Sequence, residues 1–451
     1  MTQSQDQAQS PAPPTGWLDR RFSLSARGTS TRTEVLAGFT TFLTMAYIVL
    51  VNPSILGLAG MPIASVAAAT CFAAAFASIL MGLVANTPLG LAPGMGLNAY
   101  FSFTVVQHMG VPWPVALGCV LISGVCFLFL TMTGVRQLIV SAIPTYLFAA
   151  VAGGIGLFIG FIGLKNAGIV VADPATFVAL GNLKTPGAGL ALFGLVMIGV
   201  LSVWNVRGAM LVGIVVTTIV GWLFGMVHVH ADPYSLSALT GTAFKLDLPG
   251  VFKLSGGVFE ILFVFLFVDL FDNIGTLVAV TKRAGLMDAA GRIPGLNRIL
   301  IADATATIVG SLAGTSTVTS YVESAAGVQV GGRTGLTAVV TGLLFLATMF
   351  VAPYAQIVPL AATAPALIIV GGLMLLPLTE VEWEDPLSAI PAFLTVAMIP
   401  LTFSIANGLA FGITAHAVLK LLRGTATKND WLLFLLAALF IARFVWMGGG
   451  A

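Results

Sequence analysis

The sequence predicts an all-α polytopic membrane protein, and two observations carry that prediction. Of its 451 residues, 58% are hydrophobic and 8% are charged, and the mean hydropathy is +1.03. Such a chain lacks the polar surface that soluble domains need. Apolar runs recur along almost the whole chain, each of about 17 to 25 residues, which is the length of a helix that spans a bilayer. We therefore expect nearly the whole chain to lie in lipid.

Fourteen spans can be placed by hydropathy. They lie near 34–57, 62–85, 89–107, 113–132, 141–164, 187–206, 209–228, 257–280, 298–313, 315–332, 335–352, 357–378, 386–403 and 406–423. A further apolar stretch, 430–447, is either a fifteenth span or a helix in the membrane interface. Residues 1–16 are polar and Pro-rich, without the apolar core of a signal peptide, so we expect a disordered tail over 1–21.

The basic residues predict the orientation. With the N-terminus inside the cell, 14 of the 19 Lys and Arg residues fall in cytoplasmic segments and 4 in outside loops, with Arg443 unassigned. The cytoplasmic ones are Arg20, Arg21, Arg27, Arg32, Arg136, Arg207, Lys282, Arg283, Arg292, Arg298, Arg333, Lys420, Arg423 and Lys428. We therefore expect a multi-pass protein of the inner (cytoplasmic) membrane with a cytoplasmic N-terminus.

Charge and cysteine content exclude other classes of function. A net charge of +2 gives no basic surface for nucleic acid. Cys71, Cys119 and Cys126 all fall inside apolar spans, where cysteine packs as a small side chain and forms neither a disulfide nor a metal site.

The two halves of the chain resemble each other weakly. Residues 143–158 are similar to 358–374, and the Gly-rich 88–107 corresponds to the Ser/Thr/Gly-rich 314–332. Seven spans separate the copies, and because seven is odd the second copy enters the membrane upside down. The sequence thus predicts two inverted repeats of seven spans, as in secondary transporters.

One span in each repeat is predicted to be broken. Residues 86–106 carry five Gly or Pro residues in their first half, and 314–332 begin with β-branched and hydroxyl residues. Each is expected to form a short extended strand followed by a half-helix. Irregular backbone at this depth lines a cavity or is buried in protein, and the half-helix N-termini offer free N–H donors. The alternatives are a site for a polar solute and two kinks without a ligand.

Three acidic residues are predicted deep in the membrane: Asp269 and Asp272 in span 257–280, and Glu323 at the start of the second half-helix. A carboxylate at the bilayer centre costs about 2.5–3.5 kcal/mol on insertion scales. Asp269 and Asp272 are three residues apart and share a helix face. They could pair with Arg298 or Arg333 at span ends, but we favour binding of substrate and proton, since neighbouring buried carboxylates can exchange a proton near neutral pH.

Other polar and aromatic side chains are weaker candidates. Asn98 offers a donor and an acceptor at the same level, or it caps the broken helix. Phe271 lies between the two aspartates and could stack on a planar ring. His416 is expected to be hydrogen-bonded between helices, Asp303 to lie at a helix start, and Asn52–Pro53 to end the first span.

The motifs then point to a family. The stretch SARGTSTRTEVLAGFTTFLTMAYIVLVNPSIL (25–56), with APGMGLNAYFSFTVV, VDLFDNIGTLVAV and GTSTVTSYVESAAGV, resembles the AzgA-like purine permeases of the nucleobase transporter superfamily. The resemblance covers residue 22 to the C-terminus. It implies fourteen spans, with a core domain from 33–132 and 255–352, and a gate domain from 141–228 and 357–423. It further implies purine:proton symport by movement of the core against the gate, with no cofactor besides the proton, and a homodimer through the gate domains.

The same resemblance assigns roles to four residues. Asn98, Asp269 and Glu323 match the family positions that bind the purine, and Asp272 matches a position associated with translocation. We therefore expect a symporter for hypoxanthine, guanine or adenine, in which Asp269, Asp272 or Glu323 takes up the proton. The alternatives are another nucleobase such as xanthine or uracil, an inorganic anion, a channel, and an intramembrane enzyme that uses the carboxylates.

Overall fold

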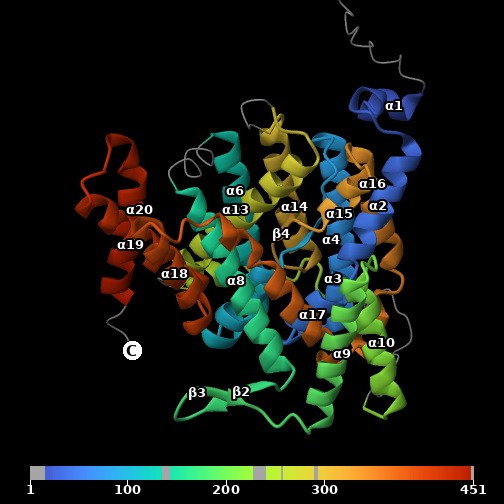
Figure 1. Cartoon of the computed structure of the whole chain (residues 1–451), viewed down its shortest axis with the longest axis horizontal. Coiled ribbons are helices and arrows are strands. Elements are labelled where there is room, and N and C mark those ends of the chain that lie inside the picture. The colour runs from blue at the N-terminus through green and yellow to red at the C-terminus, as the bar shows by residue number, and fades with distance from the viewer. Residues whose placement is uncertain (1–15, 135–142, 227–239, 255–256, 289–292, 448–451) are drawn as a thin grey trace, which may run out of the picture.

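The computed structural model describes residues 16–134, 143–226, 240–254, 257–288 and 293–447. Most helices run from top to bottom in Figure 1, with α1 (Trp17–Phe22) at one end and the hairpin of β2 (Val170–Asp173) and β3 (Phe177–Leu180) at the other. Several predicted features lie outside the described residues: tail residues 1–15, Arg136, Arg292, both ends of the 141–228 segment, and 255–256.

Nine helices of the described part are long and apolar enough to cross a membrane, with α2 and α3 counted together. They are α2 (Thr31–Met45) with α3 (Ile48–Gly57), α4 (Ile63–Val84), α6 (Trp113–Met132), α8 (Thr145–Asn166), α9 (Pro186–Val203), α13 (Gly257–Arg283), α14 (Leu296–Ala313), α17 (Leu360–Leu373) with the 3₁₀ turn Leu376–Glu380, and α19 (Ile405–Leu422). The predicted boundaries agree with these helices to within a few residues. The exact number of fourteen spans stays a prediction.

Shorter elements complete the chain. The apolar ones are α10 (Ala209–Leu223), α16 (Gly335–Thr348), α18 (Pro386–Leu401) and α20 (Trp431–Met447), and α12 (Leu248–Lys253) precedes α13. Short 3₁₀ turns lie at Ser25–Arg27, Ala352–Ile357, Leu376–Glu380 and Lys428–Asp430.

The two predicted broken spans are present. The first consists of β1 (Leu91–Pro93), α5 (Met95–Ala99) and a π-helical segment, Tyr100–His108. The second consists of β4 (Val318–Ser320) and α15 (Ser324–Gln329). β1 and β4 pair antiparallel, Leu91 opposite Ser320 and Pro93 opposite Val318. The two segments therefore enter from opposite directions, as inverted repeats require. β4 lies near mid-height in Figure 1.

Two predictions about the N-terminal region are wrong. Residues 17–21, placed in the disordered tail, belong to α1, because Phe22 and Leu24 are buried against Leu336 of α16. Asn52–Pro53 does not end the first span, since α3 continues to Gly57. The interruption lies instead between α2 and α3, at Ala46–Tyr47.

Helix α16 packs closely on α4 and α2. A Cβ on Gly335 would lie 2.0 Å from the carbonyl oxygen of Gly82, so these backbones meet at a distance that only glycine allows. On the other side, Glu34 of α2 accepts hydrogen bonds from the Arg333 N–H at 2.8 Å and the Thr337 hydroxyl at 2.6 Å. The buried carboxylate of Glu34 thus fixes the start of α16.

Helix α20 runs antiparallel to α19 over its length. Asp430 accepts a hydrogen bond from Lys420 at 2.7 Å at one end, and Arg443 donates to Asn407 at 3.1 Å at the other. The 430–447 segment therefore packs alongside α19, a helix long and apolar enough to cross a membrane, and does not lie across its end. Whether it also crosses the membrane stays a prediction. The sequence left this choice open.

The same helix also contacts α13. The ring of Phe440 lies 5.1 Å from that of Phe263, edge to face, and Arg443 forms an ion pair with Glu260. Helix α20 therefore joins α13 to α19, a connection that the sequence did not indicate.

Candidate functional site

The candidate site is built around the crossing of the two broken spans. Beyond the paired strands, the Gly94 N–H donates to the Thr317 carbonyl at 2.9 Å, and the Tyr321 N–H donates to the Gly90 carbonyl at 3.0 Å. Thr307 of α14 holds β4 through a 2.9 Å hydrogen bond to the Val318 carbonyl. These bonds satisfy backbone groups that would otherwise be unpaired in the membrane. The crossing is therefore a defined, rigid point from which α5 and α15 diverge.

Two of the three predicted acids lie at this crossing. Asp272 of α13 lies against α5, because a Cβ on Gly94 would be 3.8 Å from its Oδ2 atom. Glu323 immediately precedes α15, and its carboxylate is close enough to Asp272 for the two to interact electrostatically. The Tyr321 hydroxyl beside them donates to the Pro93 carbonyl at 2.5 Å. Side chains from α13 and from both broken spans thus converge here.

Tyr47 adds a residue that the sequence analysis missed. Its hydroxyl donates to Glu323 Oε1 at 2.7 Å. Tyr47 lies at the interruption between α2 and α3, and its ring is almost fully buried. The signal available in the sequence is a tyrosine in an otherwise apolar stretch, MAYIVL, because a buried tyrosine hydroxyl needs a hydrogen-bond partner. Only the fold shows that the partner is Glu323.

Asp269 and Phe271 occupy different surroundings on α13. Asp269 is 2% exposed, one turn before Asp272. The Phe271 ring packs on Phe148 of α8, with centroids 4.5 Å apart, and so belongs to an aromatic cluster in this conformation. The contacts that the structure describes therefore place Asp272 and Glu323 at the crossing. The roles predicted for Asp269 and Phe271 in substrate binding stay predictions.

Asn98 lies in α5 and is fully buried. Its Nδ2 atom donates to Asn52 Oδ1 at 2.5 Å, and Ser316 Oγ donates to its Oδ1 atom. The residue at the N-cap of α5 is Gly94, so Asn98 does not cap this helix. Asn52, interpreted from the sequence as part of a helix stop, is instead the hydrogen-bond partner of the predicted substrate-binding amide.

Several buried polar groups near the crossing have no hydrogen-bond partner among the described residues. They are the hydroxyls of Thr317, Thr319 and Ser320 and the side-chain amide of Asn273, which follows Asp272. A buried donor or acceptor without a partner costs about 1–3 kcal/mol, and a polar ligand can recover that cost. The crossing thus offers both carboxylates and neutral donors to a small polar solute.

The Arg333 guanidinium binds backbone carbonyls and does not pair with Glu323 or Asp272. The Arg333 guanidinium donates to the backbone carbonyls of Val328 and Gly332, at 2.7 and 2.8 Å. This side chain serves the turn before α16. Arg333 therefore does not form the ion pair with the membrane-buried acids that is the alternative to substrate binding.

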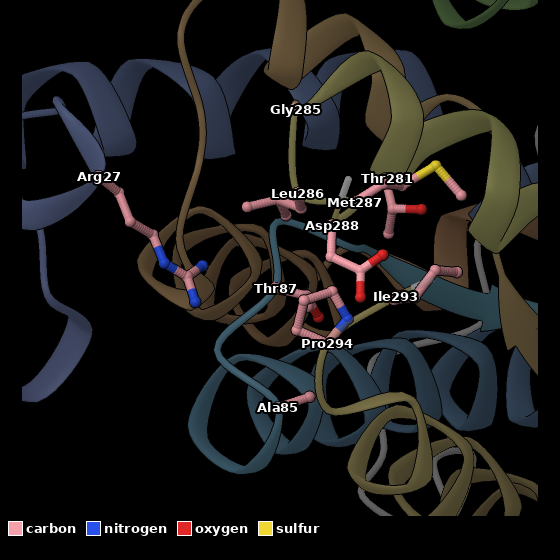
Figure 2. A pocket seen from close by; sticks show the side chains of 10 residues that line it. All are labelled: Arg27, Ala85, Thr87, Thr281, Gly285, Leu286, Met287, Asp288, Ile293 and Pro294. Atoms are coloured by element: carbon pink, nitrogen blue, oxygen red, sulfur yellow. The ribbon is translucent and has the colours of Figure 1, made fainter. Parts of the chain in front are cut away.

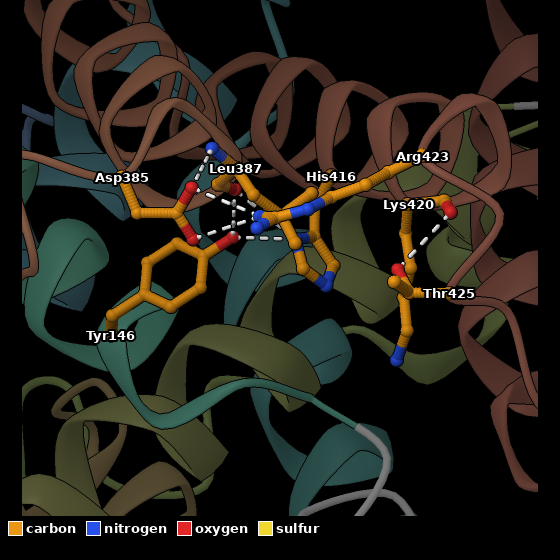
Figure 3. A network of polar contacts seen from close by, with 7 residues as sticks. All are labelled: Tyr146, Asp385, Leu387, His416, Lys420, Arg423 and Thr425. Atoms are coloured by element: carbon orange, nitrogen blue, oxygen red, sulfur yellow. Dashed lines mark hydrogen bonds and ion pairs between the residues drawn. The ribbon is translucent and has the colours of Figure 1, made fainter.

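His416 belongs to a separate network among α8, α18 and α19. The Tyr146 hydroxyl lies 2.6 Å from His416 Nδ1 and 3.1 Å from the Leu387 carbonyl oxygen. Figure 3 draws both contacts. Asp385, at the N-cap of α18, pairs with Arg423 at 3.0 Å. His416 is hydrogen-bonded between helices, as expected, and these contacts do not reach the crossing. Asp303, expected at a helix start, lies buried in the middle of α14.

A cavity of about 240 Å³ lies at the end of the molecule that carries α1. Figure 2 shows Arg27, Thr87 and Asp288 around it, between the end of α13 and the turn after α4. Burial lowers the pKa of the Arg27 guanidinium, which donates to the carbonyls of Asn86 and Arg333. The lining includes none of the predicted site residues. We therefore place the candidate site at the strand crossing.

Comparison with known proteins decides the family. The model of the Xan_ur_permease family, described as Permease family, matches residues 32–411. The chain belongs to this family. It is 47% identical to the adenine permease AdeP of Escherichia coli (strain K12), over 96% of this chain and 97% of that one. It is 43% identical to the guanine/hypoxanthine permease PbuG of Bacillus subtilis (strain 168), over 94% and 99% of the two chains. The protein is therefore a multi-pass membrane permease and not an enzyme.

Solved structures of distant transporters share the fold. The transmembrane domain of the cyanobacterial bicarbonate transporter BicA aligns with a TM-score of 0.62 at 17% identity, covering 86% of this chain and 95% of that one. Murine Slc26a9, an anion transporter, aligns with a TM-score of 0.62 at 14% identity, covering 88% and 69%. At such identities the likeness concerns the fold alone, and it confirms the predicted fold class.

Proposed function

We propose that this permease is a purine nucleobase:proton symporter that imports adenine, hypoxanthine or guanine across the cytoplasmic membrane, with its N-terminus inside the cell. The observation that carries the proposal is the convergence of Asp272 and Glu323 at the crossing of β1 and β4. The full-length likeness to adenine and guanine/hypoxanthine permeases supports the choice of purines.

Proton coupling follows from the cost of charge at this depth. Two carboxylates that interact electrostatically repel each other when both are ionised, and each is expensive to hold in the membrane. Uptake of one proton removes one charge and leaves a hydroxyl that can donate. Binding of the proton and of the substrate would then be linked at one site, because a carboxyl group changes from acceptor to donor on protonation.

Purine recognition would use the same groups. The six-membered ring of hypoxanthine or guanine carries N–H donors that match carboxylate oxygens. We assign these donors to Glu323, whose Oε1 atom is already held by Tyr47. Asp269 would accept a further ring N–H, and the α5 end of the crossing would bind the exocyclic group. The neutral hydroxyls of β4 remain for the other ring nitrogens.

The experiment is uptake of labelled adenine, hypoxanthine and guanine in cells that lack their own purine permeases. We expect saturable uptake that a protonophore abolishes. Glu323→Gln and Asp272→Asn should each reduce it at least tenfold. The matched control is Glu384→Gln, since Glu384 is exposed in the turn before α18 and should be replaceable without effect. Normal uptake by Glu323→Gln, or indifference to the protonophore, would contradict the proposal.

Competition by unlabelled bases tests the alternative substrates. We expect adenine, hypoxanthine and guanine to compete, and xanthine and uracil to compete weakly. Stronger competition by xanthine or uracil would instead assign another nucleobase to the same site.

We also propose that a core (33–132 and 255–352) moves against a gate (141–228 and 357–423), and that the gates form a homodimer. Cross-linking in native membranes tests the dimer. A monomer at every cross-linker concentration would contradict it.

A further inference from the structure

The Asn98 amide is the end of a chain of hydrogen bonds whose direction is fixed at its start. Thr70 Oγ1 donates its one hydrogen to the Val66 carbonyl at 2.6 Å. A hydroxyl has a single hydrogen, so towards Asn52 it can only accept. Asn52 accordingly presents Nδ2 to Thr70, at 2.7 Å.

The same Nδ2 atom donates its second hydrogen to Thr315 Oγ1 at 3.0 Å. Both N–H groups of Asn52 are then used, and its Oδ1 atom faces Asn98. Asn98 must therefore present Nδ2 to Asn52, and its Oδ1 atom faces Ser316, which donates to it. Each step leaves one orientation of the next amide, so the Val66 carbonyl determines which way Asn98 points.

The participants come from separate elements: α4, α3, α5, and the extended segment before β4. All five side chains, those of Asn52, Thr70, Asn98, Thr315 and Ser316, are fully buried. Reversing one amide would break the hydrogen bonds on both sides of it, and each buried polar atom left unpaired costs about 1–3 kcal/mol. We call this chain of hydrogen bonds, from Thr70 through Asn52 to Asn98, the relay. The amides of the relay therefore resist reversal.

The orientation has a chemical consequence at Asn98. An amide group carries two donor hydrogens and an oxygen with two lone pairs, and the relay uses one of each. One hydrogen and one lone pair remain. Reversing the amide would exchange their positions, and so exchange which ligand group each position can bind.

We propose that Thr70 and Asn52 are positioning residues that fix the Asn98 amide and thereby set the preference among purines. Adenine carries an amino donor at C6, whereas hypoxanthine and guanine carry a carbonyl acceptor there. The relay favours one of these patterns over the other. This inference rests on the proposed function, because it requires Asn98 to contact the transported base.

The test uses Thr70→Val, which keeps the shape of the side chain and removes the acceptor that orients Asn52. The ratio of the KM values for adenine and hypoxanthine uptake should change by about tenfold, as expected for one hydrogen bond of about 1.4 kcal/mol. The maximal rate should stay within about twofold of the wild type. Thr70→Ser, which keeps the hydroxyl, should leave the ratio as in the wild type.

Thr217→Val is the matched control. Thr217 is also fully buried, and its hydroxyl donates to the carbonyl four residues earlier, Gly213, at 2.7 Å. Within the described part of the chain, no asparagine donates to it. This variant should leave the ratio unchanged. If Thr70→Val does not reach the membrane, Thr315→Val removes the second acceptor of Asn52 and should shift the ratio in the same direction.

A double-variant cycle separates positioning from a structural role. In an Asn98→Ala background, Thr70→Val should change the ratio no further, because the residue through which it acts is gone. Additive effects, or an unchanged ratio in Thr70→Val while Asn98→Ala shifts it, would overturn the inference. Failure of the proposed function gives a different result: the wild-type protein would take up neither purine, and binding measured by purine-dependent thermal stabilisation would be absent.

Discussion

Breaking the Glu260–Arg443 ion pair should destabilise the protein substantially. The two side chains are 15% and 20% exposed, and the arginine also donates to Asn407 at 3.1 Å. Removing one member of a buried pair leaves an uncompensated charge, which costs about 3–5 kcal/mol. Because both side chains retain some exposure, we expect the lower end, about 3 kcal/mol for Arg443→Met.

The assay is unfolding of the purified protein in mixed detergent and SDS micelles. Arg443→Met and Glu260→Gln should each lower the free energy of unfolding by about 3 kcal/mol. The double variant should lose less than the sum, since no unpaired charge remains. Arg423→Met is the control: its pair with Asp385 is more exposed, at 56% and 34%, and such surface pairs contribute about 0–1 kcal/mol.

Two results would refute this reasoning. If Arg443→Met unfolded at the same SDS fraction as Arg423→Met, helix α20 would not depend on the pair for its attachment to α13. If the double variant lost the full sum of the single variants, the two residues would act independently, and the ion pair would not be the source of the stability.

Three further predictions concern packing, the site and pH. Gly335→Ala should lower the free energy of unfolding by more than about 3 kcal/mol, because its Cβ would meet the backbone of Gly82 in α4. Stability near that of the wild type would show that α4 and α16 can separate. Tyr47→Phe should raise the KM for purine by about tenfold, because it removes the hydrogen bond to Glu323. A hydrogen bond to a charged group contributes about 1.5–3 kcal/mol. An unchanged KM would show that other contacts orient this carboxylate. The Lys420 hydrogen bond lowers the pKa of Asp430 from 3.8 to about 2, so its stabilising effect is complete above pH 3.8 and is lost as the pH falls to about 2. Asp430→Asn should therefore lower the Tm at pH 7, and the difference from the wild type should shrink below pH 4; a difference independent of pH would contradict this.

Local sequence patterns predict the positions of the acidic residues of the candidate site. Glu323 was expected where the second half-helix begins, and it immediately precedes α15. Asp269 and Asp272 were expected on one helix face, and α13 places them one turn apart. Such features follow from hydropathy and helix geometry, which a sequence displays directly.

The partners of these residues could not be predicted. Tyr47 lies 276 residues before Glu323, and Asn52 lies 46 residues before Asn98. Nothing in a hydrophobic pattern pairs one span with another over such separations. The Asn52–Pro53 pair predicts a helix end, because proline usually interrupts helices, whereas α3 continues past it to Gly57.

The sequence by itself determined that this is a polytopic helical protein with two interrupted spans and buried acids, because membrane insertion depends on the length, polarity and order of segments along the chain. The tertiary structure alone decided which polar groups meet inside the molecule. It set the Tyr47 hydroxyl on Glu323, turned the Asn98 amide toward Asn52, and placed Arg443 on Glu260. The physical reason is that a hydrogen bond or ion pair depends on distances of a few ångströms between segments far apart in the chain, and packing alone fixes those distances.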